Sequence, residues 1–335
     1  MANILERLRA QTADWPRRVG TSLFVHDPTH GIHWLDKPPQ LFGCFQATVG
    51  RVDWSGGGRF VSRAELHSEL ERTATQYEAI ADLPHQPRLD GHYYTCGQVA
   101  AGDGATLRKL LERFNPATGA DYDLLKSAFL TPGWGGPYGA RPCFVMTSDD
   151  GRGAGKTTVV KTIGSLWGGI LSFSDKEDAS KIKTRLLSPD ALPRRVALLD
   201  NVKSHRFSWA ELEHLITASH IGGHRMYAGE AVRPNTLTWF ITLNGAALAT
   251  DMAQRAVIIK LNRPDRTATW EDDTREFVDD HREQLIADII GELQRPGDGL
   301  KSFSRWATWE RDVLNCVAEP GEAQATIAER QKAVD

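Results

Sequence analysis

The sequence predicts an α/β fold in which helices flank a parallel sheet, and three observations support this prediction. Apolar segments of strand length alternate with helix-patterned segments between residues 141 and 261. A glycine-rich loop separates the first of these strands from the helix that follows it. Two later apolar strands end in polar residues, Asp200 and Asn244. Such alternation indicates a parallel sheet, and ligands bind at the carboxyl ends of its strands.

The expected elements divide the chain into four parts. These are a small α+β domain (1–104), a helical lead-in with a glycine-rich loop (105–140), the α/β core (141–264) and a helical region (265–335). In the core we expect strands at residues 141–147, 195–199, 237–243 and 257–261, and helices at 155–167 and 209–218. Outside it we expect helices at 105–114, 121–129, 270–293 and 301–317.

The N-terminal domain is expected to combine short strands with one helix. Proline and glycine separate β-like segments at residues 18–25, 31–35 and 41–49. A helix pattern follows over residues 63–83, with Ser62 as its N-cap. The sequence PHQP comes next and is expected to be extended, because a residue before proline avoids the helical region.

The composition is that of an ordinary globular protein. Hydrophobic residues make up 41% and charged residues 25% of the 335 residues, and the formal net charge is −3. Since the whole chain is not basic, any nucleic-acid contact must come from a local patch or from a ring of subunits. The four cysteines form no C-x-x-C pair and indicate reduced thiols in a cytoplasmic protein. No apolar segment predicts a signal peptide or a membrane span.

The glycine-rich loop has the pattern of a phosphate-binding P-loop. Gly151, Gly153 and Gly155 let the backbone turn its N–H groups toward phosphate oxygens, and the helix N-terminus adds partial positive charge. Lys156 would reach the β- and γ-phosphates, and the Thr157 hydroxyl would bind Mg²⁺. The predicted nucleotide-binding residues are Asp150, Gly151, Arg152, Gly153, Ala154, Gly155, Lys156, Thr157 and Thr158.

The loop departs from the usual spacing at its first position. Asp150 stands where the pattern has its first glycine, and the glycine follows one place later. Asp149 and Asp150 also bring negative charge close to a triphosphate. We therefore expect their side chains to point away from the phosphates or toward a metal-bound water.

Asp200 supplies the second carboxylate that a P-loop requires. It ends an apolar strand, and we expect it to hold Mg²⁺ through water. Asn201 stands where many such ATPases carry a second acid, the base for the attacking water, and an amide cannot accept that proton. Three alternatives remain: Asp200 serves both roles, hydrolysis is slow, or another carboxylate contributes, namely that of Glu211, Glu213 or Glu230.

Two further polar residues complete the predicted site. Asn244 ends the next apolar strand and would orient the attacking water between the Mg²⁺ carboxylate and the γ-phosphate. Arg255 leads into the last strand of the core. An arginine there is a candidate arginine finger, which would cross a subunit interface and stabilise the transition-state charge.

With these elements in order, the chain resembles the AAA+ ATPases, and among them the superfamily 3 helicases and poxvirus-type primase-helicases of phages, plasmids and DNA viruses. The resemblance covers about residues 141–262, and the tetrad Asp200-Asn201-Val202-Lys203 resembles the Walker B region of viral superfamily 3 proteins. It is less specific upstream, at residues 15–20, 124–129 and 134–136. It implies hexameric rings around DNA and a primase or other replication partner. We expect a fragment or a compact relative of such a protein.

The resemblance also implies a hairpin between Asp200 and Asn244 that faces the pore of the ring. We expect residues 216–233 to form it, with its tight turn at Gly222-Gly223. Cationic or hydrogen-bonding side chains would contact DNA phosphates, and a tyrosine would stack on a base. The predicted DNA-binding residues are His220, His224, Arg225, Tyr227 and Arg233.

The function expected from all of this is ATP-driven DNA translocation or unwinding by a ring, with ATP and Mg²⁺ as cofactors. An alternative is an ATP-gated assembly switch that hydrolyses weakly and does not unwind DNA. A metabolic P-loop kinase is disfavoured because Asn244 and Arg255 follow in AAA+ order. His26, His30 and His33 cluster near a turn, but with no cysteine or carboxylate at ligand spacing we expect no metal site there.

Overall fold

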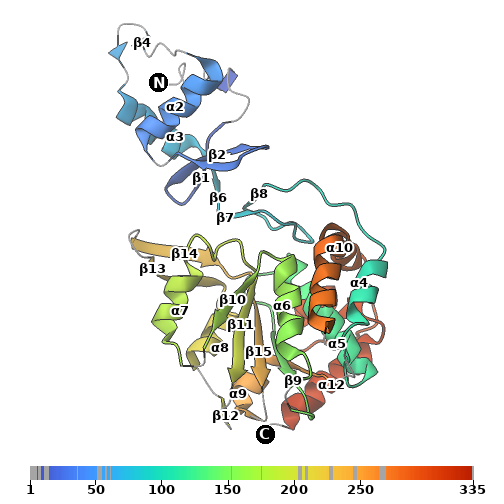
Figure 1. Ribbon diagram of the computed structural model, residues 1–335. Coiled ribbons are helices and arrows are strands. Elements are labelled where there is room, and N and C mark those ends of the chain that lie inside the picture. The colour runs from blue at the N-terminus through green and yellow to red at the C-terminus, as the bar shows by residue number, and fades with distance from the viewer. Residues whose placement is uncertain are drawn as a thin grey trace. The chain divides into compact units, whose positions relative to one another are not determined.

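The computed structural model describes residues 6, 9–10, 15–35, 37–50, 55–56, 59–60, 62–151, 153–174, 176–202, 206–207, 210–225, 229–243, 247–263 and 269–333. The chain forms two compact units (Figure 1). One comprises Met1–Asp82 and Asp90–Gly97, and the other comprises Leu83–Leu89 and Gln98–Asp335. Of the helices that the structure describes, none combines the length and the apolar composition that a membrane span requires.

The first unit is built on a four-stranded sheet with the order β3-β2-β1-β6. The strands are β1 (Arg17–Val19), β2 (Ser22–Asp27), β3 (Gly31–Trp34) and β6 (Thr75–Tyr77). Helices α2 (Pro38–Val49) and α3 (Arg63–Thr73) belong to the same unit. Its two small pairs are β4 (Ser55–Gly56) with β5 (Arg59–Phe60), and β7 (Ala79–Ala81) with β8 (His92–Tyr94). Leucine and phenylalanine side chains from β2, α2 and α3 form its apolar core.

The predicted strand at residues 41–49 is wrong, because this segment is helix α2. Two prolines occupy its first turn, where their missing N–H groups cost nothing, and the Lys37 N–H donates to the Gln40 side chain at 2.9 Å. Leu41, Phe42 and Phe45 are buried in the core. Their spacing of one and four positions suits one face of a helix, whereas in a strand they would alternate between faces.

The helix predicted at residues 63–83 is ten residues too long. It ends at Thr73, and the chain then extends through β6 and β7. Its N-cap is confirmed, since the Glu65 N–H donates to the Ser62 hydroxyl at 3.1 Å and the Ser62 N–H to the Glu65 carboxylate at 2.8 Å.

The second unit contains the predicted parallel sheet, which has five strands in the order β10-β11-β15-β9-β17. The strands are β9 (Cys143–Thr147), β10 (Ile170–Phe173), β11 (Val196–Val202), β15 (Thr238–Leu243) and β17 (Ala256–Lys260). All pairings between them are parallel, which confirms the α/β fold. Strand β10 was not predicted, because a four-residue segment gives little periodicity.

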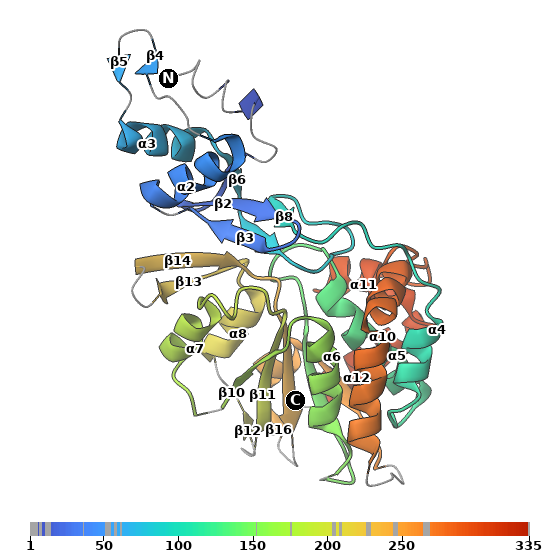
Figure 2. The same ribbon diagram turned by 45° about the horizontal axis from the view of Figure 1, so that its top comes forward.

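Helices flank this sheet (Figures 1 and 2). Those between the strands are α6 (Lys156–Leu166), α7 (Ala179–Leu186), α8 (Ala210–Thr217) and α9 (Thr250–Ala253). The others are α4 (Ala105–Leu111), α5 (Gly119–Leu130), α10 (Trp270–Leu293), α11 (Ala307–Asp312) and α12 (Pro320–Lys332). Two 3-10 turns, η1 (Thr131–Gly133) and η2 (Leu314–Cys316), and the pair β12 (Arg206–Phe207) with β16 (Ala247–Leu248) complete the unit. The single helix predicted at residues 301–317 is wrong, because only Ala307–Asp312 is α-helical there.

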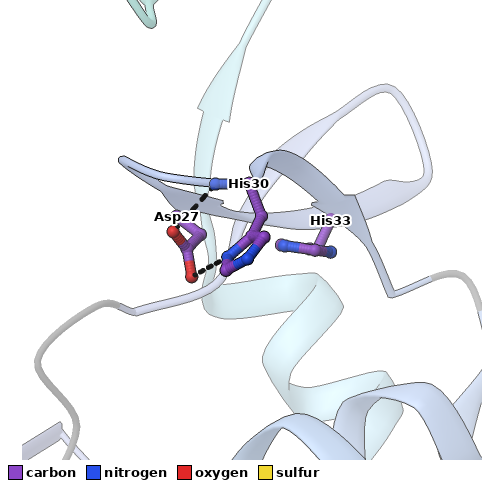
Figure 3. Close-up of side chains that lie close together, drawn as sticks. All are labelled: Asp27, His30 and His33. Carbon is purple, nitrogen blue, oxygen red and sulfur yellow. Dashed lines mark hydrogen bonds and ion pairs between the residues drawn. The ribbon is translucent and has the colours of Figure 1, made fainter.

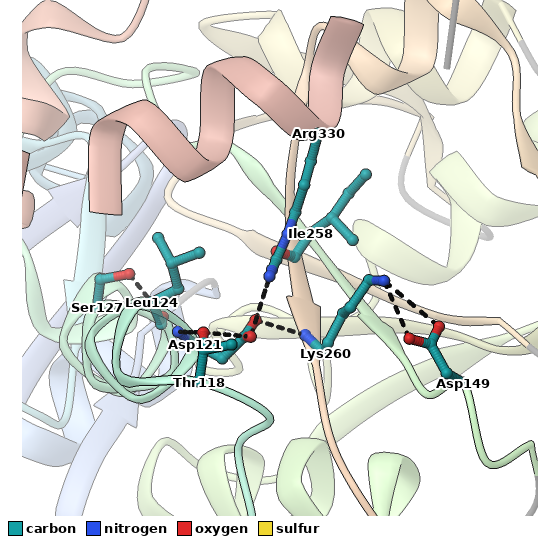
Figure 4. A network of polar contacts seen from close by, with 8 residues as sticks. All are labelled: Thr118, Asp121, Leu124, Ser127, Asp149, Ile258, Lys260 and Arg330. Atoms are coloured by element: carbon teal, nitrogen blue, oxygen red, sulfur yellow. Dashed lines mark hydrogen bonds and ion pairs between the residues drawn. The ribbon is translucent and has the colours of Figure 1, made fainter. Parts of the chain in front are cut away.

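A buried carboxylate joins three of these elements (Figure 4). Asp121 of α5 is fully buried and pairs with Arg330 of α12 at 2.5 Å. It also accepts a hydrogen bond of 2.8 Å from the backbone N–H of Lys260, the last residue of β17. The Lys260 ammonium lies 3.1 Å from the carboxylate of Asp149, which directly precedes the glycine-rich loop. The network therefore fixes the end of β17 beside that loop.

Candidate nucleotide-binding site

The glycine-rich loop leaves β9 at Thr147 and enters α6 at Lys156. Gly151, Gly153 and Gly155 have φ angles of 74°, 89° and 80°, a region that side chains other than that of glycine rarely adopt. These glycines therefore make the curled path possible. Arg152 lies outside the described residues.

Lys156 lies over the loop. Its side-chain nitrogen donates to the Gly151 carbonyl oxygen at 2.7 Å, and the residue is 7% exposed. Burial lowers the pKa of its ammonium group. Among the described residues, no carboxylate pairs with it. A largely buried cation beside a glycine-rich loop is suited to binding an anion.

Both acidic residues before the loop bind groups from β17 or the segment after it. Asp149 pairs with Lys260, as described above, and the Asp150 carboxylate accepts a hydrogen bond of 2.7 Å from the Arg263 N–H. The Asp150 N–H donates to the Ser148 hydroxyl at 3.2 Å. Each carboxylate therefore has an ion-pair or hydrogen-bond partner that is not one of the phosphate-binding glycines.

Thr157 and Asp200, the two predicted magnesium ligands, are in direct contact. The Thr157 hydroxyl donates to the Asp200 carboxylate at 2.9 Å. The hydroxyl of Thr242 in β15 donates to the same carboxylate oxygen at 2.6 Å. Hydroxyl and carboxylate oxygens are ligands that Mg²⁺ prefers, so this donor set fits the ion.

Thr242 was missed by the sequence analysis. It is 2% exposed and lies in an otherwise buried strand, where a hydroxyl needs a partner. The signal that could have identified it is a hydroxyl two residues before Asn244, the predicted polar end of the strand.

Asn201 has a backbone role at the end of β11. Its φ angle is 58°, and it lies in an irregularity of the β11–β15 pairing between Leu199 and Val202. Its N–H donates to the Thr242 hydroxyl at 2.7 Å. Asparagine tolerates this left-handed conformation better than most residues do, which gives a physical reason for an amide at this position.

The three alternative carboxylates lie in different settings. Glu213 of α8 is 8% exposed and its carboxylate is 3.5 Å from the guanidinium of Arg255. Glu230 is exposed and lies opposite His224 in a hairpin, and Glu211 is exposed on α8.

Arg255 lies at the other edge of the sheet from the P-loop. Its carbonyl accepts the N–H of Cys143, the first residue of β9, whereas the loop follows the last residue of β9. Its guanidinium also donates to the Asp251 carbonyl at 2.6 Å. Five residues of strand span about 16 Å, so Arg255 is too far away to reach the P-loop of its own chain.

Two contacts bring later segments to the P-loop. The Thr158 hydroxyl, predicted to contact nucleotide, donates to Glu271 of α10 at 2.6 Å. A Cβ atom added to Gly153 would lie 3.5 Å from Nε of Arg263, so the Arg263 guanidinium lies against the loop. Arg263 was not predicted, because a single exposed arginine after a strand carries no distinguishing pattern.

The predicted hairpin is confirmed, and it consists of β13 (His220–Arg225) and β14 (Gly229–Pro234). It extends beyond the sheet next to α7 (Figures 1 and 2). The predicted turn at Gly222-Gly223 is wrong, since these residues pair with Val232 and Ala231 within the ladder. A Cβ on Gly223 would lie 3.4 Å from the Leu187 side chain, so glycine lets the strand approach the end of α7.

The predicted DNA-binding residues differ in their accessibility. His220 and His224 are exposed. Arg233 is 4% exposed, and its guanidinium donates to four backbone carbonyls, those of Leu186, Ala191, Leu192 and Arg194. Burial lowers its pKa to about 10. A DNA contact by Arg233 is therefore wrong, because its donors hold the chain after α7.

Three of the predicted residues are described incompletely or not at all. Arg225 ends β13, and its side chain lies outside the described part. Tyr227 and Asn244 lie outside the described residues.

Solved structures of the NrS-1 C-terminal region share this fold. An apo structure of the NrS-1 C-terminal region matches with a TM-score of 0.53 and 11% identity, over 97% of this chain and 74% of that one. A second form of it matches with a TM-score of 0.52 and 12% identity. A JCV helicase structure matches with a TM-score of 0.35 and 13% identity, over 68% of this chain and 61% of that one. No protein-family model and no curated protein matches the chain.

Proposed function

We propose that the chain is an ATP-dependent DNA translocase or helicase of a phage or mobile-element replication system, and that it acts as a ring. The observation that carries the proposal is the contact of Thr157 with Asp200 beside Lys156. A hydroxyl and a carboxylate that suit Mg²⁺, next to a glycine-rich loop, support the proposal. When bound, Mg²⁺ would neutralise charge on the β- and γ-phosphates.

Each part of the site has a distinct task in this proposal. The loop N–H groups and Lys156 bind the phosphates, and Thr157 and Asp200 hold the metal. Thr242 orients the Asp200 carboxylate through its short hydrogen bond. Arg263, which lies against Gly153, adds positive charge on the outer side of the loop. Asn244 would orient the attacking water.

Arg255 would complete the site of a neighbouring subunit. The sheet separates it from the P-loop of its own chain, so a role in hydrolysis requires a second copy. Its contact with Glu213 holds the guanidinium until a neighbour's nucleotide competes for it. This requirement supports a ring, as the resemblance to AAA+ ATPases implies.

The hairpin β13–β14 is the proposed DNA contact. His220, His224, Arg225 and Tyr227 would face the pore, and Arg233 would hold the base of the hairpin. Six copies would concentrate donors for phosphates although each chain has a net charge of −3.

The experiment that tests the proposal is ATP turnover with and without single-stranded DNA. We expect DNA to stimulate turnover severalfold, and Lys156→Ala to abolish nucleotide binding. Lys161→Ala, an exposed lysine on the same helix, is the matched control and should behave like the native chain. Nucleotide affinity retained by Lys156→Ala would refute the assigned site.

A second function is favoured by Asn201. Asn201, whose backbone is left-handed, has an amide where many such ATPases carry the acid that activates water. The chain would then serve instead as an ATP-gated assembly switch. Slow turnover that DNA does not stimulate, together with ATP-dependent oligomerisation, would support the switch and exclude the motor.

A further inference from the structure

The hairpin of β2 and β3 brings three possible metal ligands together in the first unit (Figure 3). Asp27 ends β2, His30 lies in the turn, and His33 lies in β3. One donor atom from each residue lies within 4.8 Å of the other two, so the expectation that no carboxylate lies at ligand spacing to these histidines is wrong. This cluster includes two imidazole ligands, whereas the nucleotide site in the second unit offers oxygen ligands.

The strand register explains why these side chains meet. Asp27 pairs with Gly31, and Val25 pairs with His33. Asp27 and His33 are therefore diagonal neighbours on one face, a spacing that long side chains bridge. His26 points to the opposite face by alternation, and its ring contacts the Tyr93 hydroxyl at 3.1 Å.

The turn prepares the carboxylate of Asp27. One of its oxygens accepts hydrogen bonds from the N–H groups of Thr29 at 2.7 Å and His30 at 3.0 Å. These bonds lower the pKa of Asp27 to about 2, so the group is ionised at neutral pH. The other oxygen lies 3.3 Å from Nδ1 of His30.

We propose that Asp27, His30 and His33 bind a divalent transition metal of the Zn²⁺ class. Two imidazole nitrogens and one carboxylate oxygen suit Zn²⁺, Co²⁺ or Ni²⁺ and are poor ligands for Mg²⁺. Tetrahedral coordination at about 2.0–2.1 Å places donor atoms roughly 3.3 Å apart. The pair of Asp27 and His30 already has this separation, and His33 is exposed and needs a side-chain rotation. Three protein ligands leave the fourth position to water.

Calorimetric titration of the full chain with Zn²⁺, without nucleotide or Mg²⁺, tests this site. The native chain should bind one equivalent of Zn²⁺. His33→Ala should weaken this affinity at least tenfold, because even the mutation of a residue that only supports a metal ligand costs about tenfold or more in affinity. Co²⁺ in place of Zn²⁺ should give the visible absorption of a site with nitrogen ligands. His92→Ala changes a histidine of the same unit outside the cluster and should leave the affinity unchanged.

Thermal unfolding separates a binding site from a folding defect. Zn²⁺ should raise the midpoint of the native chain and of His92→Ala, but not that of His30→Ala or His33→Gln, because a ligand stabilises only the state that binds it. Circular dichroism would verify that both variants are folded. Zn²⁺ binding that survives His30→Ala together with His33→Ala, or that is lost in Asp200→Ala instead, would overturn the proposal.

Discussion

The carboxyl and amino ends of the parallel strands form two edges of the five-stranded sheet. These edges differ in how many of their functional contacts form within one chain. At the carboxyl edge, Lys156, Thr157, Asp200 and Thr242 already touch one another or the loop. At the amino edge lie Arg255 and the base of the hairpin, which precedes β15. The first edge is thus assembled by folding alone. In the proposed function, the second edge acquires its partners through a neighbouring subunit and DNA.

Among the substitutions that distinguish the two edges, Arg255→Ala is expected to have the largest effect on ATP turnover. Nucleotide binding should persist, and turnover should fall about 10³-fold, because an arginine finger acts on the transition state. Mixing Arg255→Ala with Lys156→Ala should restore part of the activity, since mixed rings contain interfaces with both native residues. ATPase assays on such mixtures measure this. If mixing restores nothing while Arg255→Ala remains inactive, the arginine does not act across a subunit interface.

Arg233→Ala should cost about 3 kcal/mol of stability, because four backbone carbonyls lose their donor. Chemical denaturation measures this loss. His224→Ala on the exposed part of the hairpin is the control and should change stability by less than about 0.5 kcal/mol. An equally stable Arg233→Ala would show that the amino edge does not depend on this anchor.

Thr242→Val should lower turnover about tenfold, in line with the loss of one hydrogen bond to a charged group. It should also raise the Mg²⁺ concentration required for half-maximal rate. Thr242→Ser keeps the hydroxyl and should retain most of the rate. A rate unchanged in Thr242→Val would mean that the Asp200 carboxylate needs no orientation by β15.

Changing His224 and Arg225 together to alanine should give the smallest effect, a severalfold loss of DNA affinity with basal ATP turnover unchanged. The salt dependence of binding should become shallower by about one or two phosphate contacts per subunit. Fluorescence anisotropy at several salt concentrations measures both quantities. Unchanged DNA affinity would contradict the hairpin assignment.

At the carboxyl edge, the sequence could predict that the glycine-rich loop, Thr157 and Asp200 lie together, because its signals are local. Glycine spacing, the lysine after it and the aspartate that ends an apolar strand all lie within short segments. The amino edge was harder, because Arg233 has the same sequence appearance whether it faces DNA or donates to backbone carbonyls after α7. The hairpin turn was misplaced for a similar reason: Gly223 is needed for its approach to Leu187, a distant contact.

The tie between Asp121 and Arg330 has a consequence for synthesis on the ribosome. Lys260 and Arg330 are 70 residues apart, and translation adds roughly 5–20 residues per second, so the strand is made roughly 4–14 s before its partner. During that interval the Asp121 carboxylate lacks the cation that neutralises it in the finished fold. The nascent chain therefore completes the network of Asp121, Lys260 and Arg330 beside the P-loop only after α12 has been made. Nucleotide binding should therefore be gained only once α12 has been synthesised.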